Sequence, residues 1–351
     1  MIGFRIAART EITGLREILL RVAAAFVALV ASGLIMALMK YNPLDIFAKI
    51  ISGSLGSSYR FQETIVKAIP LCVLSMGTAV AFRMKFWNIG QEGQFYMGAY
   101  GAALIGFGFP NLPAPLLLSL MFIAGLIFGG LWAMIPALLK ISLSTNETLV
   151  TLMLNYIAIK WISFLQYIVW KDPKALGFPK IAPFSANAVL PRLFNIHIGW
   201  VISLCLAAVL YIILKKTKFG YEIDVIGESE ATARYAGIGV FKITVIAIAL
   251  SGGLCGVAGM MQASAVEHSL SDQLSGGLGF TSVIVAWLAR LEPTAILIMA
   301  FLFSLLIQGG NYLQSSLQIP ASISLVLQGI IIFFVLGSEF FIRYRFVRGM
   351  N

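Results

Sequence analysis

The sequence consists largely of apolar runs separated by short polar or basic stretches. Their approximate bounds are 22–39, 65–82, 94–109, 116–139, 148–169, 199–214, 243–262, 278–289, 294–311 and 320–341. A helix needs about 20 apolar residues to cross the hydrocarbon core of a bilayer. Lipid supplies no partners for free backbone groups, so such runs must be helical. The pattern predicts an all-α, polytopic membrane protein with about ten transmembrane helices, forming a single transmembrane domain over residues 1–351.

The charged residues support this class and indicate an orientation. Only 11% of the residues are charged, the mean hydropathy is +0.92 and the net charge is +10, whereas about a quarter of a soluble domain is charged. Lys and Arg gather at the ends of the apolar runs, about twice as many on one side as on the other. We therefore expect both termini in the cytoplasm, no nucleic-acid partner and a location in the cell membrane. The cytoplasmic N-terminus would span 1–21, an external loop 171–198 and a cytoplasmic loop 215–242.

Several kinds of chemistry have no basis in the sequence. The three cysteines lie singly within apolar runs, and the two histidines, His197 and His268, fall in expected external segments. No G-x-x-x-x-G-K-[ST] stretch occurs to hold nucleotide phosphates. We therefore expect no catalytic residues, metal or cofactor, and any dependence on ATP would require a partner chain.

A polar stretch rich in glycine follows the second apolar run. Lipid tolerates a non-helical break only where protein or a water-filled cavity covers it. A carboxylate at a helix centre costs about 2.5–3.5 kcal/mol on insertion scales, so Glu92 requires an explanation. Either the stretch lines a pathway, or Glu92 sits at the interface, paired with Arg83 or Lys85, and shapes a turn. The candidate pathway or gate residues are Asn88, Gln91, Glu92, Gln94, Phe86 and Trp87.

Phe86 and Trp87 have two interpretations of their own. Aromatic side chains stack on flat rings such as nucleobases. They also anchor membrane proteins at the interface between lipid and water. The sequence leaves both open.

Two breaks at corresponding positions indicate internal symmetry. The run at 278–289 is short and follows the glycine-rich stretch 275–279, which is typical of a broken helix in a transporter. It lies after the seventh run, as the first break lies after the second. Five spans that begin inside end outside, so the arrangement predicts an inverted five-helix repeat with some helices short or broken.

Small residues spaced four apart mark two helix-packing surfaces. Gly125 and Gly129 share a face of one run, and Gly252 and Gly256 share a face of another. Such spacing lets helix backbones approach closely. We expect both surfaces to pack within one protein.

A short helix is expected in the cytoplasmic loop. Ser229 is suited to cap its N-terminus, Glu230 and Arg234 complement its dipole, and Gly237 is suited to end it. A short projecting helix offers a surface on which an ATPase can act; the alternative is a helical turn that merely orders the loop.

Three stretches carry a family resemblance. Phe86–Gln94 resembles the F-x-N-I-G-x-E-G-Q signature of inner-membrane permeases of ABC importers for nucleosides and simple sugars, a family that resembles ribose and branched-chain amino acid permeases. Gly227–Ile238 resembles the family's G-x-N-P-x-A-A-x-Y-A-G-I segment, with Ser229 and Glu230 in place of Asn-Pro and Thr232 in place of the first alanine. Ser251–Gly259 resembles its S-G-x-x-x-G-x-x-G stretch.

The resemblance implies a permease subunit that forms the translocation pathway for nucleosides or simple sugars. It implies a cytoplasmic ATP-binding subunit, a second permease subunit (identical or different), an extracytoplasmic solute-binding protein and a surrounding lipid bilayer as partners. ATP hydrolysis would take place on the partner chain. The residues expected to couple to the ATPase are Gly227, Glu228, Ser229, Glu230, Arg234, Tyr235, Gly237 and Ile238.

Other classes remain as alternatives. The solute could be a branched-chain amino acid. A self-sufficient, ion-coupled secondary transporter would use Glu92 as a proton relay. A lipid-processing membrane enzyme is a further candidate, against which the lack of a nucleophile–base pair argues.

Overall fold

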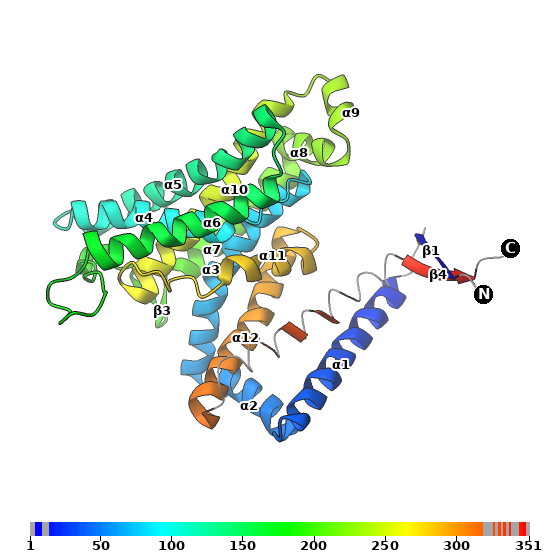
Figure 1. Cartoon of the computed structure of the whole chain (residues 1–351), viewed down its shortest axis with the longest axis horizontal. Coiled ribbons are helices and arrows are strands. Elements are labelled where there is room, and N and C mark those ends of the chain that lie inside the picture. Colours follow the sequence, from blue (N-terminus) through cyan, green and yellow to red (C-terminus); the bar gives the residue numbers. More distant parts are fainter. Residues whose placement is uncertain are drawn as a thin grey trace. The chain divides into compact units, whose positions relative to one another are not determined.

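The computed structural model describes residues 4–8, 14–318 and 344–348, with isolated positions between 326 and 337. The described chain is mostly helical (Figure 1). It divides into two units, residues 1–64 with 305–351 and residues 65–304. The tenth expected span, 320–341, lies almost wholly outside the described residues.

The first unit contains two helices that meet at a sharp bend. α1 (Gly14–Leu38) and α2 (Pro43–Leu55) are bent by 117°. The Asn42 side chain caps α2 by accepting a hydrogen bond from the Leu44 N–H, as a short polar side chain does at a helix start. The strand β1 (Phe4–Ala8) pairs antiparallel with β4 (Tyr344–Arg348). Buried side chains form a small core at Met36, Ile46, Ile50 and Leu313.

The second unit holds the remaining helices, and α3 and α12 continue from it into the first unit. The α-helices are α3 (Ser58–Arg83), α4 (Gln91–Gly108), α5 (Ala114–Leu143), α6 (Glu147–Phe164), α7 (Gly199–Lys216), α8 (Lys218–Glu228), α9 (Glu230–Tyr235), α10 (Val240–Gln262), α11 (Leu278–Leu288) and α12 (Pro293–Leu317). Single π-helical turns extend α6 and α10 at η1 (Leu165–Val169) and η3 (Ala263–Glu267). A short helix, η2 (Ala186–Ala188), and a hairpin of β2 (Arg192–Leu193) with β3 (Ile196–His197) lie between α6 and α7.

Within the described residues, six helices are long and apolar enough to cross a membrane, or seven if the bent pair α1–α2 counts as one span. They are α3, α5, α6 with η1, α7, α10 with η3, and α12. α11, with 11 residues, is too short to cross as a single helix, as its sequence predicts. The prediction of a multi-span helical protein is confirmed.

The two small-residue surfaces pack against each other, with α5 on α10. A Cβ atom on Gly256 would lie 2.1 Å from the Gly125 carbonyl oxygen, and one on Gly129 would lie 2.3 Å from that of Gly252. On the α4 side, a Cβ on Gly98 would lie 2.0 Å from the Cα of Gly256. α10 therefore packs closely, backbone to backbone, against both α4 and α5, and these two helices also contact each other.

Candidate functional site

The chain leaves the helical path between α3 and α4. Residues 84–90 are non-helical, and Lys85 adopts a positive φ of 53°. α4 begins at Gln91, three residues before the start expected from the apolar run. The polar candidates Gln91, Glu92 and Gln94 therefore lie in the first turn of a helix, and only Asn88 lies in the break itself.

Asn88 and Gln94 join the break to this first turn. The Gln94 Nε2 donates to the Asn88 Oδ1 at 3.0 Å, and the Asn88 Nδ2 donates back to the Gln94 Oε1 at 3.3 Å. The Asn88 Oδ1 also accepts from the Gly90 N–H at 2.9 Å. Both side chains are buried. Buried polar groups require hydrogen-bond partners, and these two side chains supply them to each other.

α6 holds the break from the other side, through two residues that the sequence analysis did not single out. The Asn155 Oδ1 accepts from the Gly93 N–H and its Nδ2 donates to the Ile89 carbonyl, both at 2.8 Å. The Thr151 hydroxyl accepts from the Ile89 N–H at 3.2 Å. Thr151 and Asn155 are polar residues four apart in a largely apolar run, so they share one helix face, and that spacing is the signal by which they could have been found.

Glu92 binds the second break. Its Oε2 accepts a hydrogen bond from the Gly279 N–H at 2.8 Å, in the first turn of α11. A carboxylate at a helix N-terminus is stabilised by the free amides and the helix dipole. The interpretation that pairs Glu92 with Arg83 or Lys85 is wrong, since Glu92 is buried and the Arg83 guanidinium binds Asp224 and Glu292 instead. The two breaks are therefore joined to each other.

The remaining polar candidate, Gln91, is only half satisfied. Its Nε2 donates to the Asn88 carbonyl at 2.7 Å, while its Oε1 has no hydrogen-bond partner among the described residues. Asn88, Gln91, Glu92 and Gln94 line neither of the two cavities described below.

The two aromatic candidates have different surroundings. Phe86 is buried, and the Lys140 Nζ lies 4.8 Å from its ring centroid. Trp87 is 45% exposed and stacks on Trp287 with ring centroids 5.8 Å apart. Both tryptophans line a cavity of about 510 Å³, together with Phe82 and charged side chains. Only Trp87 therefore presents a ring to open space.

The segment between α7 and α10 contains the expected short helix. The Ser229 Oγ caps α9 by accepting from the Thr232 N–H at 3.2 Å, and Gly237 has a φ of 75° just past its end. Glu230 and Arg234 form an exposed ion pair at 2.6 Å. Tyr235 is 95% exposed. The α9 prediction is confirmed, whereas α8, capped by the Thr217 hydroxyl, was not predicted.

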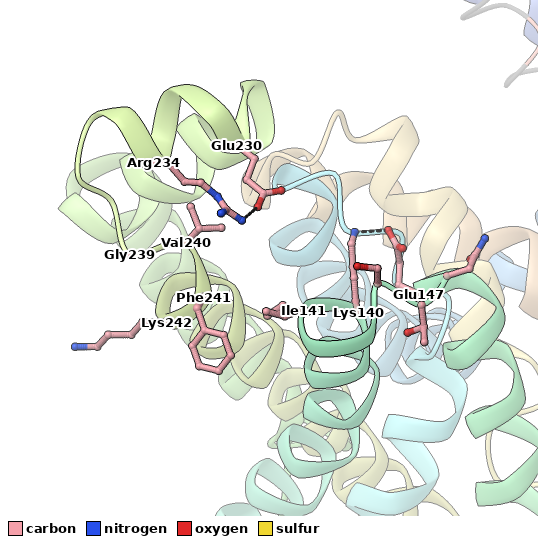
Figure 2. A pocket seen from close by; sticks show the side chains of 12 residues that line it. Lys140, Ile141, Glu147, Glu230, Arg234, Gly239, Val240, Phe241 and Lys242 are labelled. Carbon is pink, nitrogen blue, oxygen red and sulfur yellow. Dashed lines mark hydrogen bonds and ion pairs between the residues drawn. The ribbon is translucent and has the colours of Figure 1, made fainter.

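A larger cavity of about 900 Å³ lies beside α9. Figure 2 shows its walls: α9 and the start of α10 on one side, the end of α5 and the start of α6 on the other. Lys140 pairs with Glu147 across the turn from α5 to α6 at 2.6 Å. The exposed ring of Phe241 and the side chain of Ile141 add apolar area. Both charged and apolar groups therefore line this groove.

The loop at 171–198 packs against the helices. The Phe184 N–H donates to the His268 carbonyl at 2.8 Å, and the Leu190 N–H donates to the Ser264 hydroxyl at 3.1 Å. In Figure 1 this loop and the α8–α9 segment lie at opposite ends of the second unit. Among the described residues, no three His, Cys, Asp or Glu side chains gather in a way that could hold a metal ion.

Comparison with known proteins places the chain in a family. Residues 61–336 match the family described as the permease component of the branched-chain amino acid transport system. Because this match covers most of the chain, the protein belongs to that family. It is a multi-pass membrane permease of the ABC transporter type, in agreement with the resemblance of its three motifs.

Individual relatives resemble it over nearly their whole length. The chain is 29% identical over 344 residues to the guanosine ABC transporter permease protein NupP of Bacillus subtilis, covering 95% of this chain and 97% of the relative. It is 28% identical over 331 residues to the nucleoside ABC transporter permease protein NupB of Lactococcus lactis, covering 91% of each. It is 28% identical over 334 residues to the glucose ABC transporter permease protein TsgB13 of Haloferax volcanii, covering 91% of this chain and 87% of the relative.

Proposed function

We propose that this chain forms the translocation pathway for nucleosides in an ABC importer. The observation that carries the proposal is the end-to-end similarity to NupP and NupB, whose names specify guanosine and nucleosides. Glucose is the second candidate, because the similarity to TsgB13 is nearly as extensive. Branched-chain amino acids, which the family description names, are a more distant third.

The partners follow from this proposal. A cytoplasmic ATP-binding subunit docks at α9 and at the groove beside it. A second permease subunit completes the pathway, and an extracytoplasmic binding protein delivers the solute to the loop at 171–198. Both termini lie in the cytoplasm, and about ten helices, arranged as an inverted repeat, cross or enter the membrane. The exposed Tyr235 and the self-contained Glu230–Arg234 pair support the docking assignment, because neither contributes to the core.

The buried polar residues hold the pathway helices in place. Asn88 and Gln94 fix the break, and Glu92 joins α4 to α11, so that the two interrupted segments keep one geometry. Glu92→Gln keeps an acceptor for the Gly279 N–H but loses the charge, which weakens the bond by about 1 kcal/mol. We expect the variant to insert normally and to transport more slowly; an uptake rate equal to that of the wild type would contradict this role.

The test is uptake into liposomes that contain the complex purified from its own cells. We expect ATP inside the liposomes, together with the binding protein outside, to drive uptake of radiolabelled guanosine at least about tenfold above that of glucose or leucine, a difference of about 1.4 kcal/mol. Faster uptake of glucose would assign the chain to sugars. Uptake driven by a proton gradient without ATP would identify a secondary transporter and overturn the proposal.

A further inference from the structure

Arg83 occupies an unusual position at the end of α3. It is the last helical residue before the break at 84–90, and its side chain is only 7% exposed. Its Nη2 binds the Glu292 Oε1 at 2.8 Å, its Nη1 lies 3.3 Å from the Asp224 Oδ1, and its Nε donates to the Leu291 carbonyl at 3.3 Å. One guanidinium thus holds three acceptors from distant parts of the chain.

The three acceptors belong to elements that surround the C-terminal end of α3. Asp224 is on α8, while Leu291 and Glu292 form the turn between α11 and α12. Glu292 also binds the Lys215 Nζ at 2.7 Å, at the end of α7. A planar guanidinium with five fixed donors suits such a junction, whereas an ammonium group is a single point charge.

The backbone makes a second contact at the same place. A Cβ on Gly227 would lie 1.9 Å from the Arg83 carbonyl oxygen, so the last turn of α8 rests directly on the main chain of Arg83. The Ser229 N–H donates to the Val225 carbonyl, which joins the end of α8 to the cap of α9. α9 is therefore joined to Arg83 through α8, with only Ser229 between the two helices.

We propose that Arg83 is the positioning residue that transmits movement of the α8–α9 segment to the break between α3 and α4. This inference rests on the proposed function, in which an ATPase moves α9. The chain of contacts runs from Ser229 to Val225 in the last turn of α8, from Gly227 and Asp224 of the same helix to Arg83, and from there into the break that ends at Gly90. Chains of packed and hydrogen-bonded elements of this kind carry energetic coupling between distant sites.

The experiment measures deuterium uptake of residues 84–91 in the complex with its ATPase, with and without Mg-ATP and vanadate. We expect the wild type to change its exchange rate in this segment at least about fivefold on nucleotide trapping. Arg83→Gln and Asp224→Asn should each remove most of this change, and the double variant should resemble Arg83→Gln alone, because both act through one contact. Asp224 is half exposed, so Asp224→Asn tests the contact in a chain whose core is intact.

Two further variants separate coupling from structure. Arg83→Lys keeps the charge but cannot reach all three acceptors, so we expect a partial response. The matched control is Lys218→Gln with Glu222→Gln, which breaks an ion pair of 3.4 Å lying wholly within α8, and it should respond as the wild type does.

The outcomes distinguish this inference from the proposed function. A wild-type chain that retains no ATPase overturns the proposed function. A wild type that retains its ATPase and responds, together with Arg83→Gln and Asp224→Asn variants that respond equally well, overturns the inference alone. Additive effects of the two substitutions would also contradict it.

Discussion

Two segments of the second unit differ in how they are built: the loop between α6 and α7, and the segment with α8 and α9 between α7 and α10. The loop at 171–198 anchors itself on the helices through four buried side chains, those of Ile181, Phe184, Leu190 and His197, although the tip of the loop at Leu176 is exposed. The segment that contains α8 and α9 projects instead, and Tyr235 at its tip is 95% exposed. The first loop packs into the fold of this chain, whereas the tip of the second segment is exposed, as the proposed docking of an ATPase requires.

The largest difference between the two segments should appear when a ring is removed from each. Phe184→Ala removes a buried ring whose centroid lies 4.8 Å from that of Phe107, and we expect a loss of about 3 kcal/mol in stability. Tyr235→Ala should change stability by no more than about 0.5 kcal/mol. Thermal unfolding of the two purified variants checks this, and equal losses would contradict the contrast.

Acid should destabilise the buried loop through His197. Burial, with a smaller contribution from the charge of Arg192, lowers the pKa of His197 from 6.5 to about 4. Between pH 6.5 and pH 4, His197 is protonated in the unfolded chain but neutral in the folded chain. The contribution of His197 to the free energy of unfolding is therefore fully present above pH 6.5 and is lost as the pH falls from 6.5 to 4. The loss is at most about 3 kcal/mol. Thermal unfolding from pH 7 to 4 should show this slope in the wild type and a shallower one in His197→Leu; identical slopes would assign the acid sensitivity to other groups.

Loss of the N-terminal cap of α9 should destabilise this helix without lowering the stability of the whole protein. Ser229→Ala removes the acceptor for the Thr232 N–H, at a cost of about 1 kcal/mol to this helix. We expect faster amide exchange across residues 230–236 and an unchanged unfolding temperature. Ser229→Asp, which also caps a helix, should restore slow exchange; if it fails to do so, the cap is not what holds α9.

Arg234→Glu is also expected to have little effect on stability. The pair with Glu230 is exposed on both sides, and exposed pairs contribute at most about 1 kcal/mol. Reversing the charge should still weaken retention of the ATP-binding subunit, measured by co-purification. Lys218→Glu reverses another exposed charge, on α8, and serves as the control. Equal retention by the two variants would show that α9 is not the docking surface.

Local features of this protein could be read from its sequence. The bounds of α5, α7 and α10 lie within a few residues of the apolar runs, and α9 begins and ends at the residues whose side chains and φ angles require it. The spacing of the two glycine pairs predicts the packing surfaces that α5 and α10 use. Helix bounds, caps and helix-face spacing depend on residues close together in the sequence, so they can be predicted from it.

Pairings between distant residues could not be read in the same way. Nothing in the sequence indicates that Glu92 meets Gly279 rather than Arg83, or that α5 and α10 use their glycine pairs on each other. α8 was overlooked because a helix capped by a threonine within a charged loop has no apolar run to mark it. Such contacts follow from the assembled fold.

Site-specific photocrosslinking tests most directly the claim that one segment faces a partner ATPase and the other does not. A benzophenone side chain replaces Tyr235 in one variant and Leu176, which is 93% exposed in the loop at 171–198, in another. Irradiation of intact membranes should join position 235, and not position 176, to the subunit that binds ATP. Crosslinking of that subunit to position 176, or to neither position while the complex still co-purifies, would contradict the account.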